Sequence, residues 1–459
     1  MFGNNVAFEM AANYDSCAGN HQLARVTHSQ DNPSKPLGFW SCWSLTVGIM
    51  IGSGVFLLPS VLAPYGTLSF VGWLLTGGGS VLLALVFARL ATRTHQSGGV
   101  YIYTRDAFGD LPSFLVAWGY WTCYWIAIPA MAIAFVGYLG VFVPALNDNM
   151  LAQCLVALGL IWLSIWINCL GLREASSVQL LMTLLKLIPL LLIVALAAYS
   201  GTGENLPSFN PKQASPLTVL ATTALLTMWA FSGMEAGAMP AGDVKNPTQT
   251  IPRAIIWGTV TVAFVYIAST AAVMLLVPAE DLVQSNAPFA DAAQGLGSWG
   301  PSLIAIGAMV STAGAMHGVI FVSGQIPMAV AVDRLAPALF ARRNSGGSPT
   351  LSLLIVGVLA SILLATNYSR GLLGMFTFLA MMSTLAFMVP MIVCSLAEFR
   401  YSMTSERAWA AVALLAFLYS VFAVLGSGWT TIAWGLVFLA AGIPIYYWMR
   451  RANPEAAST

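Results

Sequence analysis

The stretch Ile51-Gly52-Ser53-Gly54-Val55-Phe56-Leu57-Leu58-Pro59 interrupts an apolar segment that is long enough to span a bilayer. A second break, Ser232-Gly233 followed by Pro240, interrupts another such segment in the second half of the chain. Gly and Pro leave backbone groups unpaired, which lipid does not tolerate unless the opened backbone lines a polar cavity. Two broken spans, one early in each half, are typical of a secondary transporter with its binding site at the midplane. The alternative is that these glycines only allow helices to pack closely.

The composition indicates a polytopic membrane protein. Hydrophobic residues make up 58% of the 459 positions and charged residues only 8%, whereas soluble domains carry about a quarter charged residues. Apolar runs of membrane-spanning length lie at 40–62, 67–91, 113–143, 150–170, 178–200, 215–240, 254–277, 300–332, 350–366, 372–397, 408–426 and 429–449. We therefore predict an all-α integral membrane protein with twelve transmembrane helices, of which helices 1 and 6 are broken.

If spans 1 to 5 and spans 6 to 10 form two repeats, the first helix of each repeat is the broken one. The first repeat covers about residues 40–200 and the second about 215–398, and helices 11 and 12 (408–449) are then peripheral. Residues 1–36 are polar and lack the apolar core of a signal peptide, so we expect a disordered cytoplasmic tail or a mis-assigned start. The transporter domain is expected over 37–450, with a second cytoplasmic tail at 451–459.

Positive charges predict the orientation, because cytoplasmic loops retain Lys and Arg. If the N-terminus is inside, only Lys212 and Arg370 face outward, and an even number of spans puts both termini in the cytoplasm. The basic residues on the inner side are Arg25, Lys35, Arg89, Arg93, Arg105, Arg173, Lys245, Arg253, Arg334, Arg342, Arg343, Arg400, Arg407, Arg450 and Arg451. The net charge of +1 gives no support for nucleic-acid binding.

The sequence offers no set of groups for covalent chemistry. The six cysteines are scattered and include no CxxC pair, and no His/Cys cluster has the spacing of metal ligands. Nothing resembles a Ser/His/Asp set, a phosphate-binding loop or a zinc motif. We expect neither an enzyme nor a bound metal or cofactor.

Two full charges remain at membrane depth, Lys186 and Glu235, and each is costly there by at least about 2.5 kcal/mol. Glu235 follows the second break, which favours a gate or cavity role over a packing carboxylate. Lys186 either pairs with Glu235 or with carbonyls freed by the first break, and such a contact could serve structure and coupling together. Trp229, one turn before the break, either closes over a substrate or packs against lipid or in the core. His317 is either a hydrogen-bonded structural residue or a group that titrates near neutral pH.

Several motifs in order resemble the amino acid-polyamine-organocation superfamily over about residues 37–450. They are Ile51 to Pro59, Ser97-Gly98-Gly99, Trp229 to Glu235, and Val244-Lys245-Asn246-Pro247. Within the superfamily the chain is most similar to the basic amino acid/polyamine antiporters, which include the arginine/agmatine exchanger. The resemblance implies a five-plus-five inverted repeat of the leucine-transporter type.

The resemblance also implies a binding site at the two breaks. The substrate carboxylate would meet backbone N–H groups around Ser53 and Gly54, and its amino group would meet carbonyls near Trp229, Ala230 and Ser232. A half-helix N-terminus favours an anion, and exposed carbonyls favour a cation. The expected substrate-binding residues are Ile49, Gly52, Ser53, Gly54, Tyr120, Ile128, Met131, Trp229, Ala230, Ser232 and Val319, with Lys186, Trp229 and Glu235 in gating or coupling.

Within this set, Tyr120, Met131, Trp229 and Glu235 match the exchanger. Ile49 and Ile128 replace asparagines, about Val319 replaces a tryptophan, and the gating tyrosine of helix 10 falls among Met391 to Val393. These replacements remove the groups that suit a guanidinium, so we expect neutral amino acids. The alternative is a cationic amino acid/polyamine antiporter, with Glu235 facing the substrate side chain.

Lys186 resembles the helix-5 lysine of sodium-independent relatives, in which the ammonium takes the place of a sodium ion. The expectation is therefore a sodium-independent amino acid transporter of the cell (inner) membrane that works by alternating access, as an exchanger or coupled to protons. Its partners are an amino acid or amine and the lipid bilayer. The family includes dimers and monomers, so a homodimer is possible. A distant alternative is a non-transporting sensor with the same fold.

Overall fold

The computed structural model describes residues 37–93, 100–171, 176–235, 244–332, 336–344 and 346–452. Within these ranges the secondary structure is helical, apart from an isolated parallel bridge between Leu37 and Val244. The predicted tail at 1–36, the Ser97-Gly98-Gly99 motif, Pro240 and residues 453–459 lie outside the described residues.

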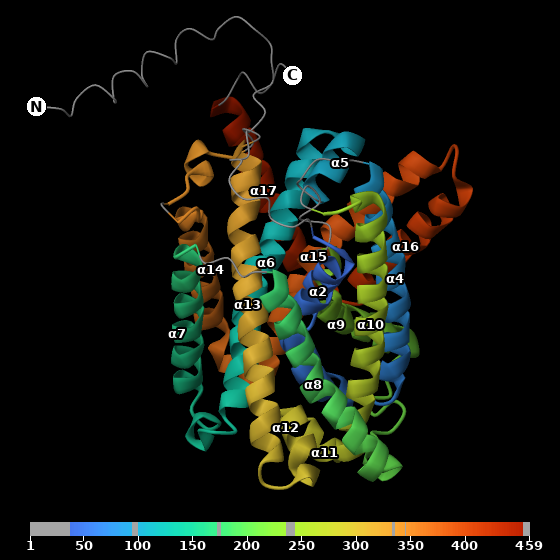
Figure 1. The fold of residues 1–459 in the computed structure, drawn as a ribbon, viewed down its shortest axis with the longest axis vertical. Helices are drawn as coiled ribbons and strands as arrows, with labels where there is room; N and C mark the ends of the chain where they lie inside the picture. The colour runs from blue at the N-terminus through green and yellow to red at the C-terminus, as the bar shows by residue number, and fades with distance from the viewer. Residues whose placement is uncertain are drawn as a thin grey trace, which may run out of the picture. The chain divides into compact units, whose positions relative to one another are not determined.

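The long helices follow the apolar runs of the sequence (Figure 1). They are α2 (Phe39–Met50), α3 (Ser53–Leu62), α4 (Leu68–Arg93), α6 (Asp110–Leu139), α7 (Met150–Cys169), α8 (Ser176–Ser200), α9 (Pro216–Phe231), α10 (Pro247–Leu276), α13 (Gly300–Val332), α14 (Thr350–Asn367), α15 (Leu372–Ser402), α16 (Arg407–Leu425) and α17 (Trp429–Ala452). Among the described residues, ten helices are long and apolar enough to cross a membrane, and the pair α2–α3, bent by 41°, makes an eleventh. The shorter helix α9 fills only part of the predicted span 215–240, so the count of twelve stays a prediction.

Short helices connect several of the spans. They are α5 (Val100–Phe108), α11 (Ala279–Leu282) and α12 (Pro288–Ala292), with 3-10 turns η1 (Ala63–Tyr65), η2 (Pro144–Leu146), η3 (Gly203–Asn205), η6 (Ala293–Leu296), η7 (Ala338–Ala341) and η8 (Tyr368–Arg370). A search for apolar runs of membrane length does not find them, because they are too short to cross the hydrocarbon core.

The helix α6 lies at the centre of the packing, where it contacts both α13 and α15. The half-helix α2 contacts α8, α10 and α13, and α4 contacts α9, α10 and α16. Among the ten described spans, α6 is the most buried and α17 the most exposed. The two broken segments are therefore enclosed by other helices, where an opened backbone is tolerated.

Small residues bring α4 close to its neighbours. A Cβ atom at Gly79 would overlap the ring of Tyr419 on α16, so the glycine is needed for this approach. On the adjacent face, the hydroxyl groups of Thr76 and Thr227 share a hydrogen bond of 2.7 Å between α4 and α9. Gly79, in the Gly77-Gly78-Gly79 motif of α4, therefore serves close packing of the helices.

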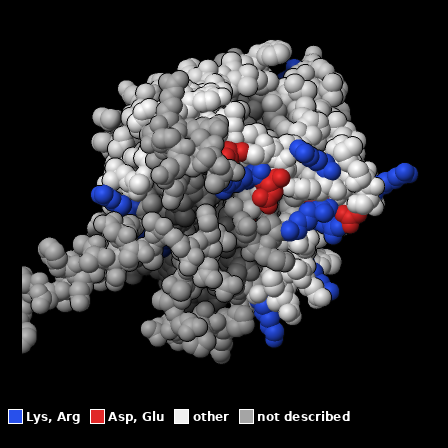
Figure 2. Space-filling model, turned by 90° about the horizontal axis from the view of Figure 1, so that it is seen from above, with Lys and Arg blue, Asp and Glu red and all other residues white. Residues whose placement is uncertain are grey.

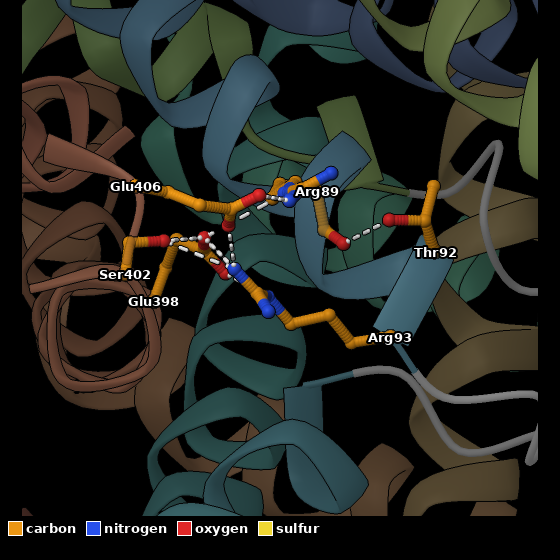
Figure 3. Close-up of polar contacts among 6 residues, drawn as sticks. All are labelled: Arg89, Thr92, Arg93, Glu398, Ser402 and Glu406. Atoms are coloured by element: carbon orange, nitrogen blue, oxygen red, sulfur yellow. Dashed lines mark hydrogen bonds and ion pairs between the residues drawn. The ribbon is translucent and has the colours of Figure 1, made fainter. Parts of the chain in front are cut away.

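An ion-pair network ties the end of α4 to α15 and α16 (Figure 3). The side chain of Glu398 is fully buried and accepts hydrogen bonds from Arg93 at 2.8 and 2.9 Å. Ser402 also donates to Glu398, at 2.6 Å, while Glu406 accepts from Arg93 at 2.9 Å and from Arg89. The hydrogen bond from Arg89 lowers the pKa of the Glu406 carboxyl, which stays ionised at neutral pH.

We expect Glu398→Gln to destabilise the protein, because the amide removes the charge that holds the Arg93 guanidinium at two points. A hydrogen bond to a charged group contributes about 1.5–3 kcal/mol, so the free energy of unfolding should fall by about 2 kcal/mol. Thermal unfolding of the purified protein in detergent measures the change. The matched variant is Glu406→Gln. Because the side chain of Glu406 is 34% exposed, this substitution should lower the free energy of unfolding less. Equal melting temperatures for Glu398→Gln and the unsubstituted protein would contradict this assignment.

Candidate functional site

The first break leaves carbonyl groups at the end of α2 without helical partners, and Lys186 meets one of them. Its ammonium donates a hydrogen bond of 2.9 Å to the carbonyl of Gly48, and its side chain is buried. One turn earlier on α8, Thr183 donates to the carbonyl of Ser44 at 3.1 Å. The helix α8 is thereby fastened to the last turns of α2. A positive charge at a helix C-terminus is favourable because it faces the negative end of the helix dipole.

Tyr266 on α10 joins the first break to the second. Its hydroxyl oxygen lies 2.5 Å from the carbonyl oxygen of Met50 and 3.1 Å from that of Ala230, so its hydrogen faces both acceptors. Ser311 on α13 donates to the carbonyl of Ile51 at 3.3 Å. Buried carbonyl groups need such partners, since an unpaired one costs free energy comparable to a lost hydrogen bond.

The second break begins where α9 ends. Gly233 has a φ of +98°, a backbone conformation that side-chain-bearing residues rarely adopt. The amide of Ser232 closes the last turn by donating to the carbonyl of Trp229 at 3.2 Å. The chain then continues through Met234 to Glu235, both buried.

The two breaks contact one another reciprocally. A Cβ atom at Gly54, in the first turn of α3, would lie 2.9 Å from Cδ1 of Trp229 and 3.1 Å from Cα of Ala230. A Cβ atom at Gly233 would overlap the side chain of Ile49 in the last turn of α2. The glycines therefore let the beginning of one half-helix approach the end of the other.

A small cavity lies between the breaks. It is lined by Ile49, Met50, Gly52, Ser53, Gly54, Cys123, Tyr124, Ala127, Met131, Trp229, Ala230, Ser232, Val319, Ser383 and Phe387. Its free volume of about 30 Å³ has room for about two water molecules, so the site must widen to take an amino acid. The Oγ atom of Ser53 is buried and has no hydrogen-bond partner among the described residues.

The cavity brings together nine of the predicted residues: Ile49, Gly52, Ser53, Gly54, Met131, Trp229, Ala230, Ser232 and Val319. Tyr120 and Ile128 are buried on α6 but do not line it. Trp229 both lines the cavity and packs edge-on against Phe376 of α15, with ring centroids 6.2 Å apart. Trp229 is therefore part of the packed core as well as of the cavity wall, and its closing over a substrate stays a prediction.

Glu235 lies behind the cavity at the end of a chain of hydrogen bonds. The hydroxyl of Tyr120 donates to its Oε1 atom, and the hydroxyl of Tyr124 donates to that of Tyr120 at 2.8 Å. The Oε2 atom of Glu235 is buried without a hydrogen-bond partner among the described residues. A buried carboxylate is thereby connected to Tyr124, which lines the cavity.

The sequence analysis missed the cavity residues Met50, Cys123, Tyr124, Ala127, Ser383 and Phe387. A signal for those on α6 was present, because Tyr124 and Ala127 continue the helical stripe between the predicted Tyr120 and Met131. On α15 the expected position among Met391 to Val393 lies one to two turns beyond Phe387. Helix spacing alone does not show which turn of α15 reaches the site.

His317 makes polar contacts away from the cavity. Its Nδ1 atom lies 2.9 Å from Nδ2 of Asn168 on α7, which also donates to the carbonyl of His317 at 3.4 Å. This contact is the hydrogen-bonded structural arrangement that we considered for the residue. Among the described residues, no group of three or more His, Cys, Asp or Glu side chains is placed to hold a metal ion.

The arrangement suits a zwitterion. The first turn of α3 presents N–H groups that have no intrahelical partner, together with the Ser53 hydroxyl, to an anion. The end of α9 presents carbonyl oxygens, each of which can accept a second hydrogen bond, to a cation.

The model of the amino acid permease family matches residues 37–450. The chain is 30% identical over 456 residues to a putative arginine/ornithine antiporter of Bacillus subtilis (strain 168), covering 90% of this chain and 97% of the relative. It is 31% identical over 330 residues to a cadaverine/lysine antiporter of Escherichia coli (strain K12), covering 71% and 73% of the two chains.

The fold also resembles a crystal structure of a manganese transporter of Eremococcus coleocola, with a TM-score of 0.58 and 12% identity over 91% of this chain and 95% of that one. This likeness concerns the fold alone and confirms the predicted all-α transporter architecture. The named relatives are transporters, which confirms the expectation of a transporter rather than an enzyme. The chain therefore belongs to the amino acid permease family of the amino acid-polyamine-organocation superfamily.

Proposed function

We propose that this protein is a sodium-independent antiporter that exchanges cationic amino acids or polyamines across the cytoplasmic membrane. The carrying observation is the buried carboxylate of Glu235, joined through Tyr120 and Tyr124 to the wall of the cavity. A carboxylate behind that wall favours a substrate with a positive charge on its side chain. The similarity to arginine/ornithine and cadaverine/lysine antiporters supports the same reading.

This proposal corrects our expectation of neutral amino acids, which the comparisons do not support. That expectation relied on Ile49, Ile128 and Val319 forming an apolar end of the cavity. Ile128 does not line the cavity, while Tyr124 and Ser383 do. These two polar side chains of the cavity wall lie at positions that the resemblance to the exchanger did not predict.

The main chain at the breaks would hold the groups common to all amino acids. We assign the carboxylate to the first turn of α3 at Ser53 and Gly54, and the α-amino group to the carbonyls near Trp229 and Ala230. The orphan hydroxyl of Ser53 supports the first assignment, because a buried polar atom without a partner is rare. Trp229 would then close over the bound substrate.

Lys186 would supply the charge that a sodium ion supplies in related transporters. Its contact with the Gly48 carbonyl places an ammonium at the negative end of α2, where a bound cation would also be favourable. Because the charge is covalently attached, transport would not depend on sodium in the medium.

We place in the cytoplasm the end of the molecule at which α4 ends and α10 begins. Figure 2 looks onto this end and shows Lys and Arg side chains spread over it. Cytoplasmic loops are enriched in these residues, which supports the orientation. The domain would then occupy residues 37–450, with both termini inside.

Exchange in proteoliposomes tests the proposal directly. Uptake of labelled ornithine or arginine should require unlabelled cationic substrate inside, and excess leucine or alanine should not inhibit it. Glu235→Gln should reduce cation uptake at least tenfold, because it removes the buried charge, whereas Glu280→Gln at an exposed position should not. Equal inhibition by leucine and ornithine would overturn the assignment to cations.

The carboxylate site is tested by Gly54→Val. The new side chain would collide with Trp229 and the backbone of Ala230, so we expect transport to be lost while the protein still folds in detergent. The control is Gly78→Val, at an exposed position of α4 where a Cβ atom meets nothing within 4 Å. Undiminished uptake by Gly54→Val would remove this turn from the site.

The role of Lys186 is tested by exchanging the cation of the medium. Replacing sodium with choline should leave the rate of exchange unchanged, and Lys186→Ala should abolish transport. Lys212→Ala, which removes an exposed lysine, should transport normally. A strong stimulation of the unsubstituted protein by a sodium gradient is incompatible with the proposal.

A further inference from the structure

We propose that the hydroxyl oxygen of Tyr124 accepts a hydrogen bond from a primary ammonium at the end of the substrate's alkyl chain. The site would then prefer alkylammonium substrates, of the type of ornithine, lysine and linear diamines, over those that end in a guanidinium. This inference rests on the proposed function, the exchange of cations through the cavity between the two breaks. It adds the chemical group that the cavity selects and the residue that selects it.

The direction of the hydrogen bonds determines whether the Tyr124 hydroxyl can donate to a substrate or accept from it. Glu235 has only acceptors when ionised, so the hydroxyl hydrogen of Tyr120 is directed to it. The oxygen of Tyr120 then accepts from Tyr124, whose hydroxyl lies 2.8 Å away. A phenol has a single hydrogen and two lone pairs, so Tyr124 retains acceptor capacity and no free donor. Hydrogen bonds in a chain polarise one another, which makes this oxygen a stronger acceptor than an isolated phenol.

Tyr124 is the member of this chain that reaches the cavity. It lines the wall, whereas Tyr120 and Glu235 lie behind it. The two tyrosine rings pack edge to face at a centroid distance of 4.9 Å, and the Tyr120 hydroxyl lies between the Tyr124 hydroxyl and the carboxylate in the chain of hydrogen bonds. A substrate in the cavity would thus contact the single hydroxyl oxygen of Tyr124 rather than the two carboxylate oxygens of Glu235.

The surrounding wall suits a small charged head on an apolar stem. Ser383 also lines the cavity, and its hydroxyl donates to the carbonyl of Cys123 at 2.8 Å and lies 3.4 Å from the Cys123 thiol, which leaves one lone pair available. The ring of Phe387 lies in the same wall and can face a cation. Met131 and Val319 also line the cavity and would present apolar surface to the alkyl chain.

Ammonium and guanidinium groups differ in what they require. A guanidinium carries five donors in a planar fork and is matched by two parallel acceptors, such as a carboxylate. An ammonium is a compact charge with three donors that rotate to separate acceptors. Single oxygens on Tyr124 and Ser383 fit the ammonium, and the carboxylate that would fit the guanidinium lies behind Tyr120.

The test is the selectivity of Tyr124→Phe in proteoliposome exchange. The unsubstituted protein should take up ornithine and putrescine with a lower KM than arginine and agmatine. Because a hydrogen bond to a charged group is lost, Tyr124→Phe should raise the KM for ornithine and putrescine at least tenfold. The KM for arginine should change less than about threefold, since in our account it makes no paired contact there. Tyr103→Phe, at a buried tyrosine outside the cavity, should leave all four values unchanged.

A second variant keeps the test informative if Tyr124→Phe does not fold. Tyr120→Phe retains the Tyr124 hydroxyl but cuts its link to Glu235, and it should also weaken ornithine more than arginine. Ligand-induced stabilisation of the purified variants against heat reports binding separately from transport. An equal effect of either variant on ornithine and arginine would overturn the inference while leaving cation exchange intact. If the unsubstituted protein exchanges no cation, the proposed function itself fails.

Discussion

The free carbonyl groups at the end of α2 are the constraint on which the centre of this protein depends. Gly48, Met50 and Ile51 are buried, and each of their carbonyl oxygens takes a hydrogen bond from a side chain of another helix. The donors Lys186, Tyr266 and Ser311 come from α8, α10 and α13. The interrupted helix α2 is thus bonded to three other helices, because its buried carbonyl groups have no water molecules to accept from.

The same interruption connects the two halves of the chain. Tyr266 lies within hydrogen-bond distance of carbonyls in both breaks, and Gly54 and Gly233 allow each half-helix to touch the other break. A movement of α9 therefore acts on α2 and α3 directly. At the far end of α4, the hydrogen bonds of Arg93 to Glu398 hold α4 against α15. A rearrangement that widens the cavity must either keep this contact or break it.

The site separates two kinds of recognition. In the proposed mode of binding, main-chain groups at the breaks hold the groups common to all amino acids. Side chains on α6 and α15, among them Tyr124 and Ser383, form another part of the cavity wall. Glu235 is connected to that wall through Tyr120 and does not line the cavity itself, so a substitution of either tyrosine would alter this connection.

The sequence by itself determined the apolar spans and the two breaks, because hydrophobic length, Gly and Pro act locally along the chain. The nine predicted residues that line the cavity came largely from the resemblance to the antiporter family. The sequence also singled out Lys186 and Glu235, since a charge among apolar residues is conspicuous without any knowledge of contacts. Only the tertiary structure decided which turn of α15 faces the cavity, that Ile128 does not line it, and that Tyr124, hydrogen-bonded through Tyr120 to Glu235, does. These facts depend on the rotation of α6 and α15 against each other, which is set by the packing of their side chains rather than by the pattern of either helix alone.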